Sequence, residues 1–313
     1  MRRVSAACCG SRRSAGAPWT VGSDWRSLGA ALATASGLRF HDEPAVAVGG
    51  GCINECLRGE TDTGPAFVKL AAPARRSMFE AEADGLRALA AADAVRVPRV
   101  LGVGSDGRHA FIGLEWLDLG GSTRGAGHLL GERMARLHRV QAPQYGWHRD
   151  NTIGTTPQHN DPCADWPQFF AERRLGFQLD LAARNGHRGR LVERGRQLVE
   201  RVDDFFADYR PVPSLLHGDL WGGNWAVTVS GEPVMFDPAV YYGDRESDLA
   251  MTRLFGGFGP EFYAAYEAAW PLAPGAGTRV TLYNLYHVLN HLNLFGGGYG
   301  TQALGMIDRL LAE

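Results

Sequence analysis

The chain has 313 residues, of which 45% are hydrophobic and 21% are charged, and its formal net charge at pH 7 is −2. These values are typical of globular proteins and exclude a disordered, collagen-like or coiled-coil chain. Because 32 basic residues are balanced by 34 acidic ones, we expect neither nucleic acid nor a membrane as a partner. Five thinly spread cysteines argue against a disulfide framework, so we expect a cytoplasmic protein.

Residues 1–22 are rich in Arg, Ser, Ala and Gly, with no acid among them. We interpret them as a disordered leader or the product of a misassigned start, although their composition also fits a targeting segment. The elements predicted after the leader are, in chain order, a helix over 25–38, strands at 45–48, 52–58 and 66–70, a helix over 77–92, and strands at 100–103 and 110–116. Turns at 49–51 and 59–65 join the first three strands into an antiparallel meander.

From residue 118 onward the hydrophobic pattern is mostly helical, with the longer helices predicted over 129–140, 166–184 and 190–209. The sequence therefore predicts an α+β fold with two lobes. A small antiparallel β-rich N-lobe spans 23–117, and a larger, mostly α-helical C-lobe spans 118–313.

One feature of the basic residues is unusual: Lys69 is the single lysine, and the other 31 basic residues are arginine. Lysine is a compact point charge on a flexible stem, whereas the guanidinium of arginine is a wide planar fork. We infer that arginine was acceptable wherever a positive charge is only solvated, and that Lys69 occupies a position where it was not.

Lys69 lies in a predicted strand shortly after the glycine turn Gly49, Gly50 and Gly51. Glycines let a backbone turn approach an anion closely, and a lysine on the following strand can neutralise phosphate oxygens. A carboxylate on the next helix can hold the ammonium in place. Glu82 is the first candidate, because it shares a helix face with Leu86 and Leu89, and Glu80 is the second.

A second group of polar residues lies in the segment LHGDLWGGN, which is followed by VMFDP. Asp219 and Asn224 have the aspartate-x4-asparagine spacing of a kinase catalytic loop, in which the aspartate accepts the proton of the substrate hydroxyl. Between Asn224 and Asp237 the pattern predicts a β-hairpin, which brings its two ends together. Asn224 and Asp237 should then present two oxygen ligands to a hard cation such as Mg²⁺.

Between these two groups, the strand that ends near Glu115 leads through Leu117 to a pair of glycines. In a two-lobed phosphotransferase this is the expected hinge, and the backbone at Glu115 and Leu117 would hydrogen-bond to adenine.

With these motifs the chain resembles the fructosamine kinase (ketosamine-3-kinase) family. That family is related to the aminoglycoside phosphotransferases and choline kinases within the protein-kinase-like fold. The matching stretches cover about residue 23 to the C-terminus and include GGGCINE at 49–55, FVKL at 67–70, FEAEADGLRAL at 79–89, NTIGTTPQHN at 151–160, LHGDLWGGNW at 216–225 and DPAVYYGDRE at 237–246.

The resemblance implies ATP-dependent phosphorylation of the 3-hydroxyl of a ketosamine, on a free amine or on a glycated lysine of a protein. The 3-phosphate decomposes and releases the amine, which makes the activity a deglycation repair. By the same resemblance Lys69 contacts the ATP phosphates and Glu82 positions it. Asp219 is the catalytic base, and Asn224 and Asp237 bind Mg²⁺.

A polar stripe of Asn284, His287 and His291 lies on one face of an otherwise apolar predicted helix. The spacing of the two histidines lacks the adjacent glutamate of a zinc protease motif, so we do not expect zinc. In the family context we interpret the stripe, together with Trp221, as part of the ketosamine pocket; the stripe is equally compatible with core groups that are hydrogen-bonded.

Two other features have alternative interpretations. The charge cluster Asp244, Arg245, Glu246 and Asp248 is either an ion-pair network that holds the metal loop or a set of substrate contacts. Cys52, beside the glycine turn, is a buried small residue or, as a hypothesis, a redox switch.

Two other functions compete with the ketosamine kinase. The first is a phosphotransferase that acts on another small hydroxylated amine, such as an aminoglycoside. The second is a catalytically silent nucleotide-binding module, which the intact set of candidate catalytic residues argues against.

Overall fold

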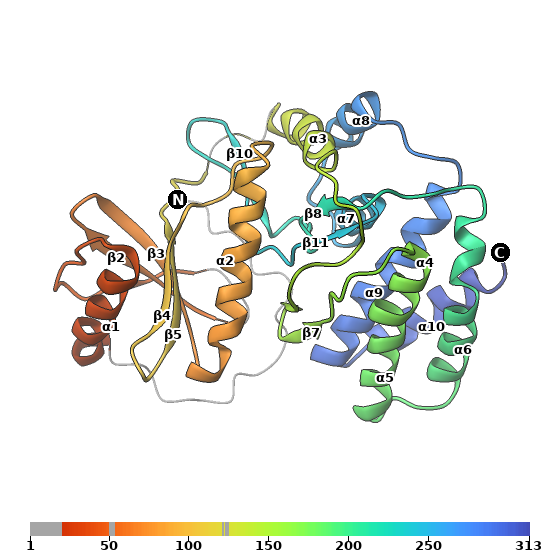
Figure 1. Cartoon of the computed structure of the whole chain (residues 1–313), viewed down its shortest axis with the longest axis horizontal. Coiled ribbons are helices and arrows are strands. Elements are labelled where there is room, and N and C mark those ends of the chain that lie inside the picture. Colours follow the sequence, from red (N-terminus) through yellow and green to blue (C-terminus); the bar gives the residue numbers. More distant parts are fainter. Residues whose placement is uncertain (1–20, 50–53, 121, 123–124) are drawn as a thin grey trace. The chain divides into compact units, whose positions relative to one another are not determined.

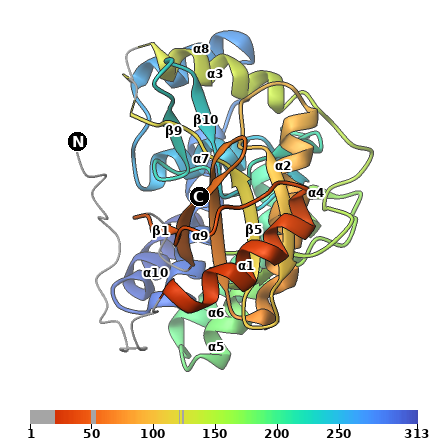
Figure 2. The same ribbon diagram turned by 90° about the vertical axis from the view of Figure 1, so that its left-hand side faces the viewer.

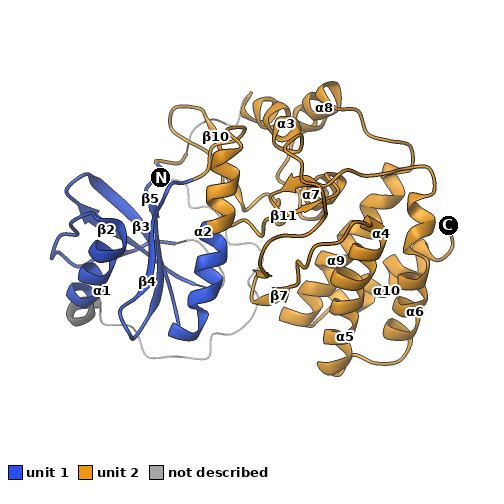
Figure 3. Cartoon of the chain, in the orientation of Figure 1, with its two compact units in different colours: residues 1–83, 98–117 blue, residues 84–97, 118–313 orange. Residues whose placement is uncertain are grey.

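The structure is a computed structural model that describes residues 21–49, 54–120, 122 and 125–313, and the side chains from residue 25 onward. Gly50, Gly51, Cys52 and most of the predicted leader lie outside the described residues. The chain divides into two compact units (Figure 3). The first unit joins the chain up to Ala83 with Pro98–Leu117, and the second joins Asp84–Val97 with Asp118–Glu313.

The first unit contains a five-stranded antiparallel sheet with the order β1-β2-β3-β5-β4. Its strands are β1 (Val46–Ala47), β2 (Glu55–Thr61), β3 (Gly64–Ala71), β4 (Val100–Ser105) and β5 (Ala110–Glu115). The meander predicted for the first three strands is confirmed by the pairing of β1 with β2 and of β2 with β3. The sheet is completed by β5, which pairs with both β3 and β4.

The turn between β2 and β3 is shorter than the predicted turn at 59–65. Thr61 pairs with Gly64, so only two residues remain in the loop. The Thr61 hydroxyl donates a hydrogen bond of 2.6 Å to the Gly64 carbonyl, and Gly64 has a φ of 114°, which favours glycine. The polar residues before and after this turn therefore belong to strand ends rather than to a loop.

Helix α1 (Val21–Ser36) covers one face of the sheet (Figure 2) and begins two residues inside the predicted leader. Its apolar residues, among them Trp25 and Leu32, form a core with Val68 and Leu70 of β3. Because side chains alternate along a strand, Lys69 points to the opposite face of the sheet from these two neighbours.

Helix α2 (Arg76–Ala91) follows a 3₁₀ turn at Pro73–Arg75, and its second half belongs to the second unit. The predicted N-lobe, 23–117, includes residues 84–97, which the structure groups with the second unit. The reason is packing: a Cβ at Gly85 would lie 2.9 Å from Val240, and the amide of Met235 donates to the carbonyl of Arg96.

The second unit is mainly helical (Figure 1). Its α-helices are α3 (Ala126–Leu137), α4 (Trp166–Phe169), α5 (Phe177–Arg184), α6 (Arg190–Glu200), α7 (Glu246–Leu254), α8 (Pro260–Ala269), α9 (Ala276–Phe295) and α10 (Tyr299–Leu310). Helix α9 packs against α5, α7 and α10, and α3 packs against α8. The core around α9 is aromatic, and there the indole of Trp166 donates to the hydroxyl of Tyr283.

Two of the predicted helices differ from those observed. The helix predicted over 190–209 stops at Glu200 and continues as a 3₁₀ helix at Val202–Phe206, because Arg201 leaves helical geometry and donates to the Leu311 carbonyl. The helix predicted over 166–184 contains a π-helical segment, Phe170–Gly176, in which Arg174 is fully buried. Both differences arise from contacts with residues distant in sequence.

Three pairs of short antiparallel strands hold the loops of the second unit. They are β6 (Asn151–Ile153) with β7 (Thr156–Gln158), β8 (Ser214–Leu216) with β11 (Tyr241–Gly243), and β9 (Trp225–Val227) with β10 (Pro233–Met235). Among the described residues, no helix is long and apolar enough to cross a membrane.

Candidate active site

Lys69 and Glu82 form a largely buried ion pair in the first unit. The ammonium Nζ lies 2.6 Å from Oε1 of Glu82, and the two side chains are 6% and 11% exposed. Strand β3 turns Lys69 toward α2, and Glu82 lies on the second turn of that helix. Glu80, the second candidate, forms an ion pair with Arg76. The ion pair fixes the position of the Lys69 ammonium beside the sheet.

The other nucleotide-binding candidates of the first unit are only partly described. Gly49 precedes the part of the glycine turn that lies outside the described residues. Glu115 ends β5, where its amide donates to the carbonyl of Arg99 and its carboxylate accepts from the amide of Arg99. Leu117, two residues later, is half-buried. The backbone at Glu115 is thereby held firmly at the end of the sheet.

In the second unit, Asp248 of α7 holds the loop that follows β8. Its carboxylate accepts hydrogen bonds from the amide of His217 at 2.7 Å and from the amide of Gly218 at 2.9 Å. His138 approaches the same carboxylate with Nε2 at 3.2 Å. These three donors fix the backbone immediately before Asp219.

The loop after β8 and the loop after β10 are joined by hydrogen bonds at several points. The amide of Asp219 donates to Nδ1 of His217, so the proton of this ring lies on Nε2, which donates to the carbonyl of Phe236. Burial lowers the pKa of His217, which keeps the ring neutral. The amide of Ala239 returns a hydrogen bond of 2.8 Å to the carbonyl of His217.

Gly218 is required where these two loops approach most closely. Its φ is 81°, and a Cβ at this position would lie 2.0 Å from the carbonyl oxygen of Ala239. Any side chain here would push the loops apart.

The β9–β10 hairpin brings Asn224 and Asp237 together, and the amide of Phe236 donates to the carbonyl of Asn224. The side-chain nitrogen Nδ2 of Asn224 donates to Oδ2 of Asp219 at 3.0 Å and approaches the backbone carbonyl of Asp237 at 3.4 Å. Asp237 has a φ of 57°, a strained value for a residue other than glycine. Three of the predicted residues therefore meet at one point.

Asp219 is half-buried, and its surroundings change its acidity. Desolvation raises its pKa to about 7, the negative charge of Asp237 adds to the shift, and the hydrogen bond from Asn224 opposes it. A carboxyl group that titrates near neutral pH suits a general base, because it is ionised in much of the population and still binds a proton well.

The donor set of this junction fits Mg²⁺. Carboxylate and amide oxygens are the ligands that this ion prefers, and a cation would relieve the repulsion between Asp219 and Asp237. The described residues contain no group of three or more His, Cys, Asp or Glu side chains that could hold a metal by themselves. Mg²⁺ commonly takes only one or two protein ligands and completes its coordination with phosphate oxygens and water, a pattern that Asn224 and Asp237 would fit.

Trp221 and His291 are connected through an aromatic residue that the sequence did not single out. The ring of Trp221 meets Phe255 edge-on at 6.1 Å, and Phe255 lies 4.8 Å from the ring of His291. Phe255 directly follows α7. In the sequence it is one more aromatic residue in an aromatic-rich segment, so no local signal distinguishes it.

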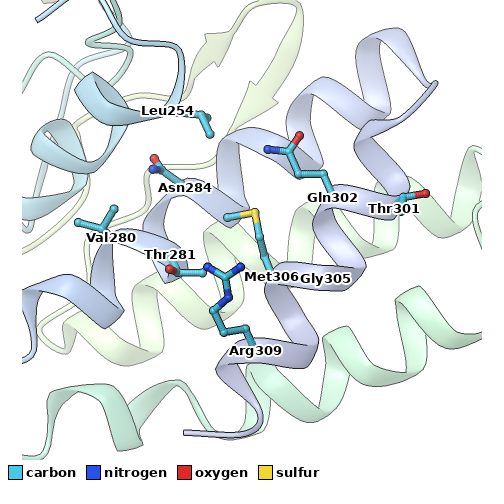
Figure 4. Close-up of a pocket in the computed structure, with 9 residues that line it drawn as sticks. All are labelled: Leu254, Val280, Thr281, Asn284, Thr301, Gln302, Gly305, Met306 and Arg309. Atoms are coloured by element: carbon cyan, nitrogen blue, oxygen red, sulfur yellow. The ribbon is translucent and has the colours of Figure 1, made fainter.

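His287 and Asn284 each bury a polar atom that has no hydrogen-bond partner among the described residues, namely Nδ1 of His287 and Oδ1 of Asn284. Burial lowers the pKa of His287 to about 3, so its ring is neutral. Asn284 also borders a cavity of about 420 Å³ between α9 and α10 (Figure 4). The residues that line this cavity do not include Trp221, His287 or His291, so it unites Asn284 with none of the other predicted substrate residues.

The charge cluster after Asp237 is a structural network. Glu246 accepts two hydrogen bonds from Arg279, Asp244 accepts from the hydroxyls of Tyr209 and Tyr283, and Arg245 donates to the carbonyl of Trp270. All four charged side chains of the cluster are buried. Of the two interpretations open from the sequence, the structure supports the network that holds the loops.

The family model described as fructosamine kinase matches residues 24–313 of this chain. A protein of Synechocystis named "Probable ketoamine kinase" is 45% identical over 291 residues, which cover 92% of this chain and 97% of that protein. The rice protein (Oryza sativa subsp. indica) named "Protein-ribulosamine 3-kinase, chloroplastic" is 43% identical over 267 residues, or 84% of this chain and 78% of that protein.

A solved structure resembles the whole described fold. The crystal structure of a "Putative fructosamine-3-kinase" from Haemophilus somnus superposes with a TM-score of 0.83 at 32% identity, and the match covers 92% of this chain and 97% of that chain. The α+β, protein-kinase-like fold that the sequence predicts is confirmed by this likeness.

Proposed function

Because this chain belongs to the fructosamine kinase family, we propose that it transfers the γ-phosphoryl group of ATP to the 3-hydroxyl of a ketosamine. The chain is an enzyme of the phosphotransferase class. The observation that carries the proposal is the junction of Asp219, Asn224 and Asp237, where a carboxyl group with a pKa of about 7 lies beside the two residues that we propose as Mg²⁺ ligands.

Asp219 accepts the proton of the 3-hydroxyl as the hydroxyl oxygen attacks the γ-phosphorus and ADP leaves, so that the products are the ketosamine 3-phosphate, ADP and one proton. Asn224 donates to Oδ2 of Asp219 and so orients the carboxylate. The loop that carries the base cannot shift easily, because Asp248 and the Phe236 carbonyl hold its backbone and the His217 ring.

In this proposal Lys69 neutralises phosphate oxygens of ATP, and Glu82 holds its ammonium in place. The turn at Gly49, Gly50 and Gly51 would cradle the phosphates, and the backbone at Glu115 and Leu117 would bind adenine. Mg²⁺ held by Asn224 and Asp237 would offset the charge of the transferring phosphoryl group.

For the ketosamine we propose Trp221, Asn284, His287 and His291 as contacts. The two buried atoms without a partner, on His287 and Asn284, support this role, because a sugar hydroxyl can both donate and accept. We propose both free amines and glycated lysines of proteins as carriers of the sugar. The unstable 3-phosphate would release the amine, which makes the reaction a repair step, and we place it in the cytoplasm because of the few cysteines.

An aminoglycoside is the weaker alternative, since the relatives at more than 40% identity are named for ketoamines or ribulosamine. The candidate contacts Trp221, Asn284, His287 and His291 also carry no acid that would pair with the ammonium groups of an aminoglycoside. A silent nucleotide-binding module would not need to retain Lys69, Glu82, Asp219, Asn224 and Asp237 together.

The test is an assay of ATP consumption by the purified protein with ribulose-lysine, fructose-lysine, erythrulose-lysine and a peptide that carries ribulosyl-lysine. We expect phosphorylation of at least one of them, with the phosphate located at C3 by ³¹P NMR, and none of kanamycin. The Asp219→Asn variant, purified in the same way, controls for a contaminating kinase. Turnover of kanamycin combined with silence toward every ketosamine would contradict the substrate class and leave the phosphotransferase chemistry intact.

A further inference from the structure

Two side chains of the β6–β7 hairpin form hydrogen bonds with the backbone of the loop that carries Asp237. The side-chain amide of Asn151 donates a hydrogen bond of 2.8 Å to the carbonyl of Val240, and that of Gln158 donates one of 3.2 Å to the carbonyl of Ala239. Gln158 also donates to Oδ1 of Asn151 at 2.8 Å, which couples the two contacts. Two consecutive carbonyls, two and three residues after Asp237, are therefore held from the same side.

The hairpin is itself held in place by buried groups. Tyr286 of α9 donates its hydroxyl to Oε1 of Gln158 at 2.8 Å, and Asn160 donates to Oδ1 of Asn151 at 3.0 Å. Arg174, fully buried in the π-helical segment, donates to Oδ1 of Asn160 and stacks on the ring of Tyr241 with its guanidinium carbon 4.2 Å from the ring centroid. Gln158 is 1% exposed. Its amide can thus adopt only one orientation, with the nitrogen toward the loop.

Ala239 connects these hydrogen bonds to the loop that carries Asp219. Its amide donates to the carbonyl of His217, and its own carbonyl lies against Gly218 and accepts from Gln158. Gly85 of α2 packs closely against the side chains of Pro238 and Val240, because any Cβ there would lie within 3.5 Å of them. The backbone from Pro238 to Val240 is held on several sides, and the strained φ of Asp237 needs such support to persist.

We propose that Gln158 and Asn151 are positioning residues of the phosphoryl-transfer site. They clamp the carbonyls of Ala239 and Val240, and through these they set the direction of the Asp237 backbone and its spacing from the loop of Asp219. In this proposal both residues act through the loop backbone and not on the reacting atoms. The part of the proposal that concerns Mg²⁺ rests on the proposed function, whereas the part that concerns the loop does not.

The experiment compares Gln158→Met with the matched control Gln178→Met. Gln178 is also fully buried in the second unit. Its side-chain amide makes hydrogen bonds with Asn290 and Asn293 of α9 and interacts with Tyr286, but it makes none with the described loop at 237–241. Methionine keeps the length of glutamine and removes the amide, so both variants lose buried hydrogen bonds of the same kind. Asn151→Ala serves as a second variant in case Gln158→Met does not fold.

Hydrogen–deuterium exchange of the peptide that spans residues 236–241 is the first readout. We expect faster exchange in Gln158→Met and Asn151→Ala, and wild-type exchange in Gln178→Met. The second readout is calorimetric affinity for ATP with and without Mg²⁺. We expect metal-dependent affinity about tenfold weaker or more in Gln158→Met, the usual cost of removing a group that orients a metal ligand. Affinity for ATP without metal should not change.

In the kinetic assay, Gln158→Met should lower kcat and leave the KM for ketosamine unchanged. Unchanged exchange at 236–241 in both test variants would overturn the proposal, and so would equal effects of Gln158→Met and Gln178→Met. If no ketosamine is turned over by the wild type, the proposed function fails, but the exchange readout still decides whether Gln158 and Asn151 hold the loop.

Discussion

Replacing Asp248 with Asn tests how much its hydrogen bonds to the loop before Asp219 contribute to the stability of the fold. The carboxylate accepts from the amides of His217 and Gly218 and lies 3.2 Å from Nε2 of His138, and it is fully buried. In the Asp248→Asn variant one of the two oxygens becomes an NH₂ group, which must face a backbone N–H whichever way the new side-chain amide is turned. At least one buried backbone amide then loses its acceptor.

The expected magnitude follows from these contacts. An orphaned buried N–H costs about 1–3 kcal/mol, and the remaining bond loses the extra strength of a charged acceptor, so we expect a loss of about 2–4 kcal/mol in the free energy of unfolding. Because the altered backbone directly precedes Asp219, kcat should fall as well. Urea unfolding at pH 7, followed by fluorescence, measures the loss of stability.

The pH dependence gives a second check. Burial acts to raise the pKa of Asp248, but the hydrogen bond and charge of His138 and the other donors outweigh it and hold the pKa below its usual range. A carboxyl group of this kind stabilises the fold above its unfolded pKa of about 3.9, and the contribution is lost as the pH falls through the folded pKa. The difference in the free energy of unfolding between wild type and Asp248→Asn should therefore be constant above about pH 5 and become smaller at lower pH.

Asp244→Asn is the control, since it alters a buried carboxyl group in the same segment whose pKa is shifted in the opposite direction. Burial and the charge of Glu246 raise the pKa of Asp244 to about 6. The stability of the wild type relative to this variant should fall as the pH rises from about 4 to about 6. A loss below about 1 kcal/mol for Asp248→Asn, or the same pH trend in both variants, would show that the Asp248 carboxylate does not support the loop in this way.

Three further predictions concern single residues. Asp219→Asn should lower kcat by about 100-fold or more and leave ATP affinity near that of the wild type; retention of a tenth of the rate would exclude the general base. Lys69→Arg should reduce kcat/KM for ATP, because the wider guanidinium cannot take the place of an ammonium 2.6 Å from Glu82; normal kinetics would mean that the single lysine has no special role. When the pH is lowered from 7 to 5, the free energy of unfolding of His287→Phe should fall less than that of the wild type, as measured by urea unfolding. The buried ring has a pKa of about 3 and stays neutral, whereas the same ring in the unfolded chain binds a proton; equal losses in the two proteins would contradict this.

Much of the candidate site can be predicted from the sequence because its signals are local. The turn between Asn224 and Asp237 lies between two short apolar runs, and a hairpin of that kind must bring its ends together. The alternation of β3 turns Lys69 away from the apolar neighbours Val68 and Leu70, and helix periodicity places Glu82 on the face of Leu86 and Leu89. Each of these inferences needs only residues within about two turns or one strand.

Other features were decided only by tertiary structure, because they depend on contacts between residues far apart in the chain. The end of α6 at Glu200 is set by Arg201 reaching Leu311, and the loop before Asp219 is held by Asp248, thirty residues later. The hydrogen bond from the Gln158 side chain to the Ala239 carbonyl joins residues 81 positions apart. No hydrophobic period or turn signal records such a pairing, since the free energy comes from satisfying buried backbone groups that face one another only once the chain has folded.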